Sequence, residues 1–236
     1  GPEAGEVASG DEGVGRMSDP DPIAGEVLRL LATGDLTGRR IVVTAGPTRE
    51  FLDPVRYLTN RSTGTLGYAI AARALARGHQ VTLISGPVAL AAPDGAKLID
   101  ITSADDLARE ALALLDDADA VVMTAAVADF APAEPLQHKL KKSHADLTLR
   151  LRRTTDVLAE MGRRKRPGQR LMGFCLETDN GEQEARRKLD EKNCDFIVLN
   201  TPANFGDVTA EVTVFARDGS ATALPGLGKQ QLADRL

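Results

Sequence analysis

The sequence has no tryptophan and few aromatic residues, so its core cannot depend on large rings. Aromatic residues make up 3% of the 236 residues, whereas 42% of the residues are hydrophobic. A core of Ala, Val, Leu and Ile is typical of parallel strands covered by Ala-rich helices. The hydrophobic fraction is also high enough to exclude a mainly disordered protein.

Cysteine and histidine are also scarce. Cys175 and Cys194 are too few for a disulfide framework and lack the paired spacing of a metal site. His79, His138 and His144 have neither ligand spacing nor a partnered nucleophile, which argues against histidine-based metal binding or acyl transfer. We expect two reduced, mostly buried thiols.

No hydrophobic run approaches the roughly 20 residues that a membrane-spanning helix needs. The N-terminus, rich in Gly, Asp and Glu, has no signal-peptide character. The net charge of -5 argues against broad binding of nucleic acid, which depends on a basic surface. We therefore expect a soluble, cytoplasmic protein that binds neither membranes nor nucleic acids.

From residue 40 onward, apolar runs of strand length alternate with helical patterns. We expect strands at 40–45, 80–85, 97–101, 120–125, 147–151, 170–175, 196–199 and 211–215. We expect helices at 23–32, 64–77, 104–115, 155–163, 183–192 and 230–236. This alternation predicts an α/β fold with a doubly wound, mostly parallel, Rossmann-like sheet, whose ligands gather beyond the carboxyl ends of the strands.

The loop after the first of these strands contains the ingredients of a phosphate site. Gly46 ends the strand, and Ser62, Thr63 and Gly64 open the next helix. Backbone N–H groups at a helix N-terminus and the helix dipole both favour an anion, so these residues are candidates for phosphate contacts. The alternative is that Ser62 or Thr63 only caps the helix.

An NAD(P)-dependent oxidoreductase is the competing function on this fold. Its fingerprint is a tight Gly-x-Gly-x-x-Gly turn directly after the strand. Here the connection from Gly46 to Thr63 is too long and lacks that spacing.

Two later strand ends offer candidates for binding a nucleoside. Ala125 is small enough to let a base or ribose approach the backbone, and Asp129 could accept its hydrogen bonds. The alternative is close helix packing at Ala125 and a turn cap at Asp129. Phe174, one of few aromatic residues, could stack on a base or belong to the core.

A short basic segment follows these residues. Lys139, Lys141 and Lys142 lie in a loop bounded by Pro132 and Pro135. Such a segment could swing over a triphosphate and neutralise the charge that develops on departing pyrophosphate. A solvated surface is the alternative.

Several of these strings occur together and in order in one known family. Residues 44–50 (TAGPTRE), 53–57 (DPVRY) and 125–130 (AAVADF), with the Lys-x-Lys-Lys at 139–142, make the chain resemble phosphopantothenoylcysteine synthetase from Arg40 to about Lys229. The resemblance implies a ligase. CTP, with Mg²⁺, would activate the carboxylate of 4'-phosphopantothenate as an acyl-cytidylate, and the amine of L-cysteine would then displace CMP.

The resemblance also implies roles for individual residues. Asn60 matches an Asn required for turnover of the acyl-cytidylate, Arg56 lies in the same functional loop, and Lys139 matches a Lys that assists formation of the intermediate. The implied cytidine pocket contains Ala125, Asp129 and Phe174. It assigns no protein ligands to the metal.

The family further implies how the chain is organised. Residues 1–38 resemble a linker and the remnant of a preceding flavin-dependent decarboxylase domain, and residues 39–236 the synthetase domain. We therefore expect no FMN in this chain. The resemblance also implies a homodimer, with the β-rich excursion at 130–151 as its dimerising and lid-forming region.

Two departures from the family pattern stand out. Ser9 occupies a position where many relatives have Cys, and residues 207–210 (DVTA) replace the usual Ser-Asp-x-Asn. The contacts of the second loop are therefore left open.

Overall fold

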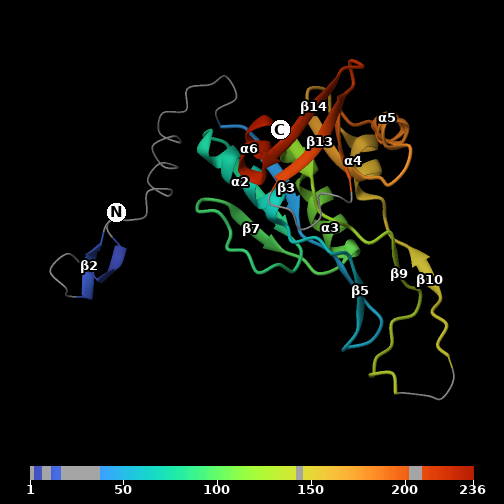
Figure 1. Cartoon of the computed structure of the whole chain (residues 1–236). Coiled ribbons are helices and arrows are strands. Elements are labelled where there is room, and N and C mark those ends of the chain that lie inside the picture. The colour runs from blue at the N-terminus through green and yellow to red at the C-terminus, as the bar shows by residue number, and fades with distance from the viewer. Residues whose placement is uncertain (1–2, 7–11, 17–37, 142–145, 202–208) are drawn as a thin grey trace.

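The computed structural model describes residues 3–6, 12–16, 38–141, 146–201 and 209–236 (Figure 1). Its centre is an eight-stranded sheet with the order β14-β13-β12-β11-β8-β3-β6-β7. The strands of this sheet are β3 (Arg40–Ala45), β6 (Gln80–Ser85), β7 (Lys97–Asp100), β8 (Ala120–Met123), β11 (Arg170–Leu176), β12 (Phe196–Asn200), β13 (Thr209–Ala216) and β14 (Ala221–Gly228). Strands β3 to β12 of this sheet pair in parallel, and β13 and β14 are antiparallel.

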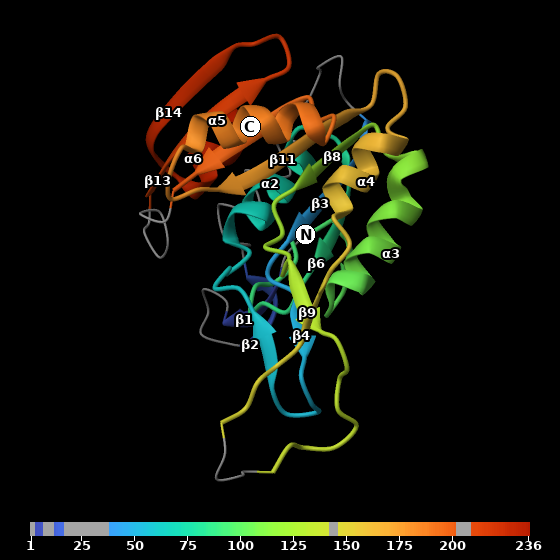
Figure 2. The same cartoon turned by 90° about the vertical axis from the view of Figure 1, so that its right-hand side faces the viewer.

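Helices cover both faces of the sheet (Figure 2). They are α2 (Thr65–Ala76), α3 (Ala104–Leu114), the short 3₁₀ helix η1 (Leu115–Asp117), α4 (Val157–Arg164), α5 (Gly181–Glu191) and α6 (Lys229–Arg235). Leu107, Met161 and Leu189 of α3, α4 and α5 belong to one core cluster. Ala71 of α2 and Ala233 of α6 belong to another, on the opposite face. The predicted doubly wound, mostly parallel fold is therefore confirmed.

The continuous apolar runs explain the central strands. Val42 and Val43 point to opposite faces of β3, yet both are buried, because helices lie on each side. The predicted strands 40–45 and 80–85 match β3 and β6, and the five predicted helices after residue 60 are confirmed to within a few residues at their ends. The helix predicted at 23–32 lies outside the described residues.

Two small hairpins project beyond the carboxyl ends of the parallel strands (Figures 1 and 2). One pairs β4 (Arg49–Phe51) with β5 (Tyr57–Thr59), and the other pairs β9 (Phe130–Pro132) with β10 (Leu151–Arg153). A third hairpin, β1 (Glu3–Glu6) with β2 (Glu12–Arg16), precedes the sheet in the chain.

Two strand predictions need correction, and some observed strands were not predicted. The strand predicted at 147–151 is wrong except for Leu151, because only three residues pair with β9 and the alternating residues before them are exposed. The strand predicted at 120–125 ends at Met123, since Thr124 and Ala125 hydrogen-bond to Thr44 instead. Strand β14 and the β4–β5 hairpin were not predicted.

Both cysteines are free and buried, as predicted. Burial raises the pKa of Cys175 to about 11 and that of Cys194 to about 12, so both are thiols at neutral pH. Within the described residues, no helix is long and apolar enough to cross a bilayer.

Candidate functional site

The chain segments that follow β3 and β8 are joined into one platform at the carboxyl edge of the sheet. Pro47 and Ala126 form a parallel bridge, and the Ala126 N–H donates to the Gly46 carbonyl at 2.9 Å. The buried Thr48 hydroxyl accepts from the Ala128 N–H at 3.0 Å. The platform, residues 46–48 with 124–128, therefore holds predicted site residues from two distant parts of the sequence.

Glycines let the N-terminus of α2 approach this platform closely. Gly46 and Gly64 have φ of 75° and 78°, and a Cβ on Gly64 would lie 3.3 Å from the Gly46 nitrogen. A Cβ on Gly67 would lie 2.5 Å from the Thr124 hydroxyl and 2.6 Å from the Ala45 methyl. Larger residues would push α2 away from the strand ends, so the glycines set the position of the first turn.

That first turn has no side-chain cap. The N-cap residue is Gly64, and no side chain hydrogen-bonds to the first N–H groups of α2. Ser62 accepts from the Gly64 N–H at 3.3 Å, and the Thr63 and Thr65 hydroxyls lie 2.8 Å apart. The capping alternative for Ser62 and Thr63 is therefore not observed, and their phosphate contacts stay a prediction.

Asn60 is anchored on the platform. Its side-chain amide donates to the carbonyls of Ala126 and Val127 at 3.0 and 3.1 Å. The neighbouring Thr59 hydroxyl donates to the Thr48 carbonyl at 2.7 Å. The end of the β4–β5 hairpin is thus fixed to the loop that contains Ala125, and two predicted groups of site residues are brought together.

The remaining nucleoside candidates differ in their surroundings. Asp129 is exposed, and its carbonyl accepts from the Thr154 N–H at 3.0 Å. Ala125 is half-buried and packs against the core cluster beneath α3 to α5. Phe174 is half-buried. It packs against the core cluster of α2 and α6 and against a further buried cluster that contains Leu232 of α6. Part of the Phe174 ring is therefore core, and stacking on a base stays a prediction.

The lysine segment is hydrogen-bonded to the β4–β5 hairpin at two backbone positions. The Leu136 N–H donates to the Leu52 carbonyl at 2.9 Å, and the Leu140 N–H donates to Asp53 Oδ2 at 3.1 Å. Lys139 and Lys141 are exposed on either side of Leu140. Lys142 lies outside the described residues.

Asp53 holds this arrangement. It begins the motif at 53–57 but was not among the predicted site residues. Burial alone would raise the pKa of its carboxyl, but the Arg56 guanidinium and backbone N–H groups hold that pKa well below its ordinary range. An Asp three residues before an Arg suggests only a local turn. The contact with Leu140 depends on tertiary structure and leaves no sequence signal.

The β4–β5 hairpin also bears on the NAD(P) alternative. Strand β3 is followed by this hairpin, and not directly by a helix with a tight glycine turn. The usual pyrophosphate turn of dinucleotide-binding folds is therefore missing between β3 and α2, as the sequence predicted.

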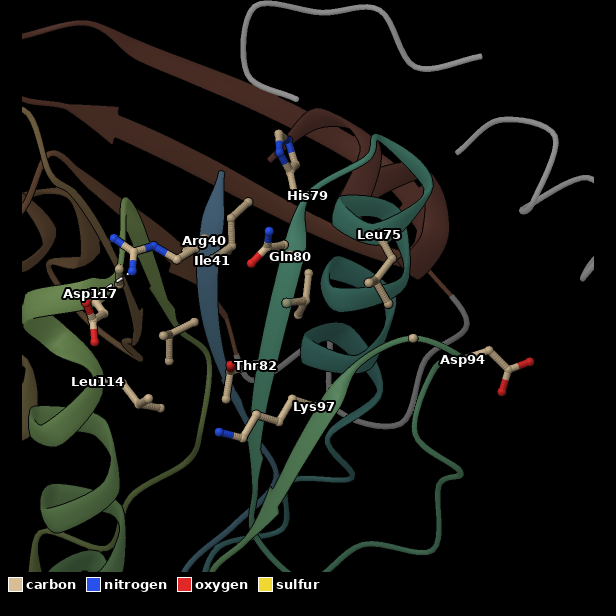
Figure 3. A pocket seen from close by; sticks show the side chains of 14 residues that line it. Arg40, Ile41, Leu75, His79, Gln80, Thr82, Asp94, Lys97, Leu114 and Asp117 are labelled. Atoms are coloured by element: carbon tan, nitrogen blue, oxygen red, sulfur yellow. Dashed lines mark hydrogen bonds and ion pairs between the residues drawn. The ribbon is translucent and has the colours of Figure 1, made fainter. Parts of the chain in front are cut away.

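A cavity of about 650 Å³ lies elsewhere, at the edge of the sheet where β3, β6 and β7 begin (Figure 3). Arg40, His79, Gln80 and Lys97 are among its lining residues, and no predicted site residue is. The cavity therefore contains none of the predicted chemistry.

Within the described part of the chain, no group of three or more His, Cys, Asp or Glu could hold a metal ion.

Comparison with known families decides the relationship. The model of the DNA/pantothenate metabolism flavoprotein C-terminal domain matches residues 36–236. The chain belongs to this family. The resemblance inferred from the strand-end motifs is thus confirmed.

Curated relatives of this family member are longer than the chain. The chain is 44% identical to the coenzyme A biosynthesis bifunctional protein CoaBC of Bacillus subtilis, and the match covers 97% of the chain and 58% of the relative. The protein of the same name from Escherichia coli is 39% identical, with 95% and 55% covered. The chain therefore spans little more than half the length of these relatives.

Solved structures agree on the fold. A crystal structure of the C-terminal domain of a CoaBC protein matches with a TM-score of 0.74 and 39% identity, covering 86% of this chain and 94% of that one. A mutant of Cab2 in complex with phosphopantothenate-cysteine has a TM-score of 0.68 at 16% identity, covering 90% of each chain, which shows only a shared fold.

Proposed function

We propose that the chain is a phosphopantothenate–cysteine ligase of coenzyme A biosynthesis. CTP activates the carboxylate of 4'-phosphopantothenate, and L-cysteine then displaces CMP. The observation that carries the proposal is the meeting of Asn60, the 124–128 loop, the uncapped N-terminus of α2 and the tethered lysine segment at one edge of the sheet. The names of the relatives support a role in coenzyme A biosynthesis.

The reaction needs positioning and charge neutralisation, which this site can supply. A carboxylate oxygen attacks the α-phosphorus of CTP and pyrophosphate leaves; the cysteine nitrogen then attacks the acyl carbon, loses a proton and expels CMP. The first turn of α2 offers N–H groups and a positive dipole end to phosphate. Lys139 and Lys141 offer charge to the leaving pyrophosphate, and no covalent nucleophile of the protein is required.

We propose that Mg²⁺ arrives with the nucleotide. Mg²⁺ is usually bound by phosphate oxygens, water and one or two carboxylates, and so does not need a dedicated cluster. No such cluster occurs among the described residues. When bound, Mg²⁺ would neutralise charge on the triphosphate.

The first test is a CMP-release assay with this chain, 4'-phosphopantothenate, cysteine and Mg²⁺. We expect CMP and amide product with CTP, and pyrophosphate release that needs phosphopantothenate. Without cysteine, CMP release should fall to a small fraction of the complete rate. Activity with ATP alone would contradict the assignment of CTP, and binding of a nicotinamide cofactor without CMP production would favour the oxidoreductase.

The proposal also covers the organisation of the chain. Residues 1–38 are proposed to be a linker and the remnant of a decarboxylase domain, and residues 39–236 the synthetase domain. The start of the family match at residue 36 supports this boundary. We propose a cytoplasmic enzyme without FMN in this chain.

A homodimer is proposed because exposed apolar side chains gather on the two projecting hairpins and the chain between β9 and β10. Most monomeric proteins do not expose such groups together. They are Phe51, Val55, Tyr57, Phe130, Leu136, Leu147, Leu149 and Leu151. A second copy of the chain that covered this surface would place two candidate sites near one interface.

Leu151→Glu should weaken such a dimer, because a carboxylate would enter a desolvated interface. We expect the dimer Kd to rise roughly tenfold or more. The measurement is molar mass by light scattering across a dilution series. Leu98→Glu on β7 is the matched control, since Leu98 and Leu151 are 39% and 42% exposed. Equal dissociation of both variants, or of neither, would contradict this interface.

A further inference from the structure

The side chain of Asp53 is completely buried in the turn between β4 and β5. Its Oδ1 accepts from the N–H groups of Val55 and Arg56 at 2.8 and 2.9 Å. Its Oδ2 accepts from Arg56 Nε at 2.9 Å, from Arg56 Nη2, and from the Leu140 N–H at 3.1 Å. Every hydrogen bond that the described residues make to this carboxylate comes from an N–H donor.

The backbone of Leu140 is held on both sides by this pair. Its N–H donates to Asp53, and its carbonyl accepts from Arg56 Nη2 at 2.7 Å. Leu140 is separated from Arg56 by 84 residues, so the contact closes a long excursion of the chain. Because Lys139 and Lys141 flank Leu140, fixing the backbone of this one residue restricts where both ammonium groups can reach.

We propose that Asp53 is a positioning residue, which acts through Leu140 to hold Lys139 and Lys141 over the phosphates of the bound nucleotide. This inference rests on the proposed function. In the proposed reaction, Asp53 does not contact the substrates. Arg56 supplies the charge that makes a buried carboxylate tolerable, and the carboxylate in turn orders the lysine segment.

The carboxylate is chemically required in this position. An Asn side chain has one accepting oxygen and one donating NH₂ group, so replacing Asp53 with Asn would place N–H donors against Arg56 or Leu140. The turn could keep the bonds from the backbone N–H groups of Val55 and Arg56 to the remaining oxygen, but the bonds from the Arg56 guanidinium and from the Leu140 N–H would be lost. The lysine segment would then be tied only through Leu136 and through the Leu140 carbonyl, which accepts from an Arg56 side chain that has lost its carboxylate partner.

The two steps of the reaction should respond differently. The lysines act on pyrophosphate, which leaves in the first step, and loosening them should slow that step. The second step releases CMP after pyrophosphate has gone, and its anchor is Asn60 on the platform. We therefore expect Asp53→Asn to slow formation of the acyl-nucleotide by about tenfold to a hundredfold and to change the reaction of preformed intermediate with cysteine by less than about threefold.

The test measures both single-turnover steps in the wild type, in Asp53→Asn and in Asp195→Asn. Asp195 is a matched control: its carboxylate is also buried, and it accepts from Lys165 at 2.7 Å and the Leu171 N–H at 2.8 Å at the opposite edge of the sheet. Asp195→Asn should lower the midpoint of thermal unfolding but leave the ratio of the two steps unchanged. An equal slowing of both steps by Asp53→Asn would overturn the proposal.

A double-mutant cycle separates positioning from general loosening. If Asp53 acts through the lysines, then adding Asp53→Asn to a variant that carries both Lys139→Gln and Lys141→Gln should cost less than about threefold more in the first step. Effects that multiply would overturn the proposal. If Asp53→Asn does not fold, Leu136→Pro serves instead, because it removes the N–H that donates to Leu52 and loosens the same segment from its other end.

Amide hydrogen exchange provides a readout that does not depend on activity. In Asp53→Asn the Leu140 amide should exchange at least about tenfold faster than in the wild type, and slow exchange in both would overturn the tether. Faster exchange with wild-type-like steps would refute the positioning role alone. A wild-type chain that releases no CMP would instead refute the proposed function on which the role rests.

Discussion

Asn60→Asp is expected to stop the reaction between its two steps, with the acyl-cytidylate accumulating. The wild-type side chain donates to the carbonyls of Ala126 and Val127. A carboxylate has no N–H to donate and would place negative charge against two carbonyl oxygens, so the platform loop must shift. CTP should still be consumed once per site, whereas amide product should fall by about a hundredfold or more.

Quenched-flow separation of CMP, pyrophosphate and the acyl-cytidylate would measure this effect. Asn193→Asp is a suitable control, because the Asn193 amide also donates to a carbonyl, that of Gly162 at 2.7 Å, but lies far from the platform in the fold. The control should lose stability without accumulating intermediate. Loss of pyrophosphate release in Asn60→Asp would show that Asn60 is needed from the first step onward.

The strands could be predicted from local sequence pattern, whereas the role of Asn60 could be predicted only from the family motifs. The runs that became β3 and β6 are continuous and apolar, so burial on both faces could be predicted from local pattern alone. The placement of glycines and polar residues at the ends of these strands likewise predicted one shared edge for the ligands. The family motifs then identified residues whose individual patterns were ambiguous.

Contacts between distant segments could not be predicted in this way. Thr48 supports Ala128 and Asp53 holds Leu140 because separate loops fold onto one another, and neither residue type nor spacing indicates the partner. The alternating pattern at 147–151 misled for a related reason. Residues form a strand only where a partner strand runs beside them, and β9 pairs with only residues 151–153.

Lys139→Gln should have the opposite effect to Asn60→Asp: formation of the acyl-cytidylate becomes slow, and little intermediate accumulates. Lys139 is exposed, and its neighbour Leu140 is tethered by Asp53 and Arg56. Removing an ammonium group that stabilises departing pyrophosphate should slow the first step by about a hundredfold. The second step, started from preformed intermediate, should change by less than about threefold.

Lys139→Arg and Lys97→Gln complete this comparison. Arg keeps the positive charge but replaces a compact ammonium with a planar group, so Lys139→Arg should recover part of the lost rate. Lys97 is an exposed lysine that lines the cavity at the opposite edge of the sheet, and Lys97→Gln should leave both steps unchanged. If Lys139→Gln and Asn60→Asp instead slowed the same step, the two loops would act together in that step. The assignment of separate roles would then be wrong.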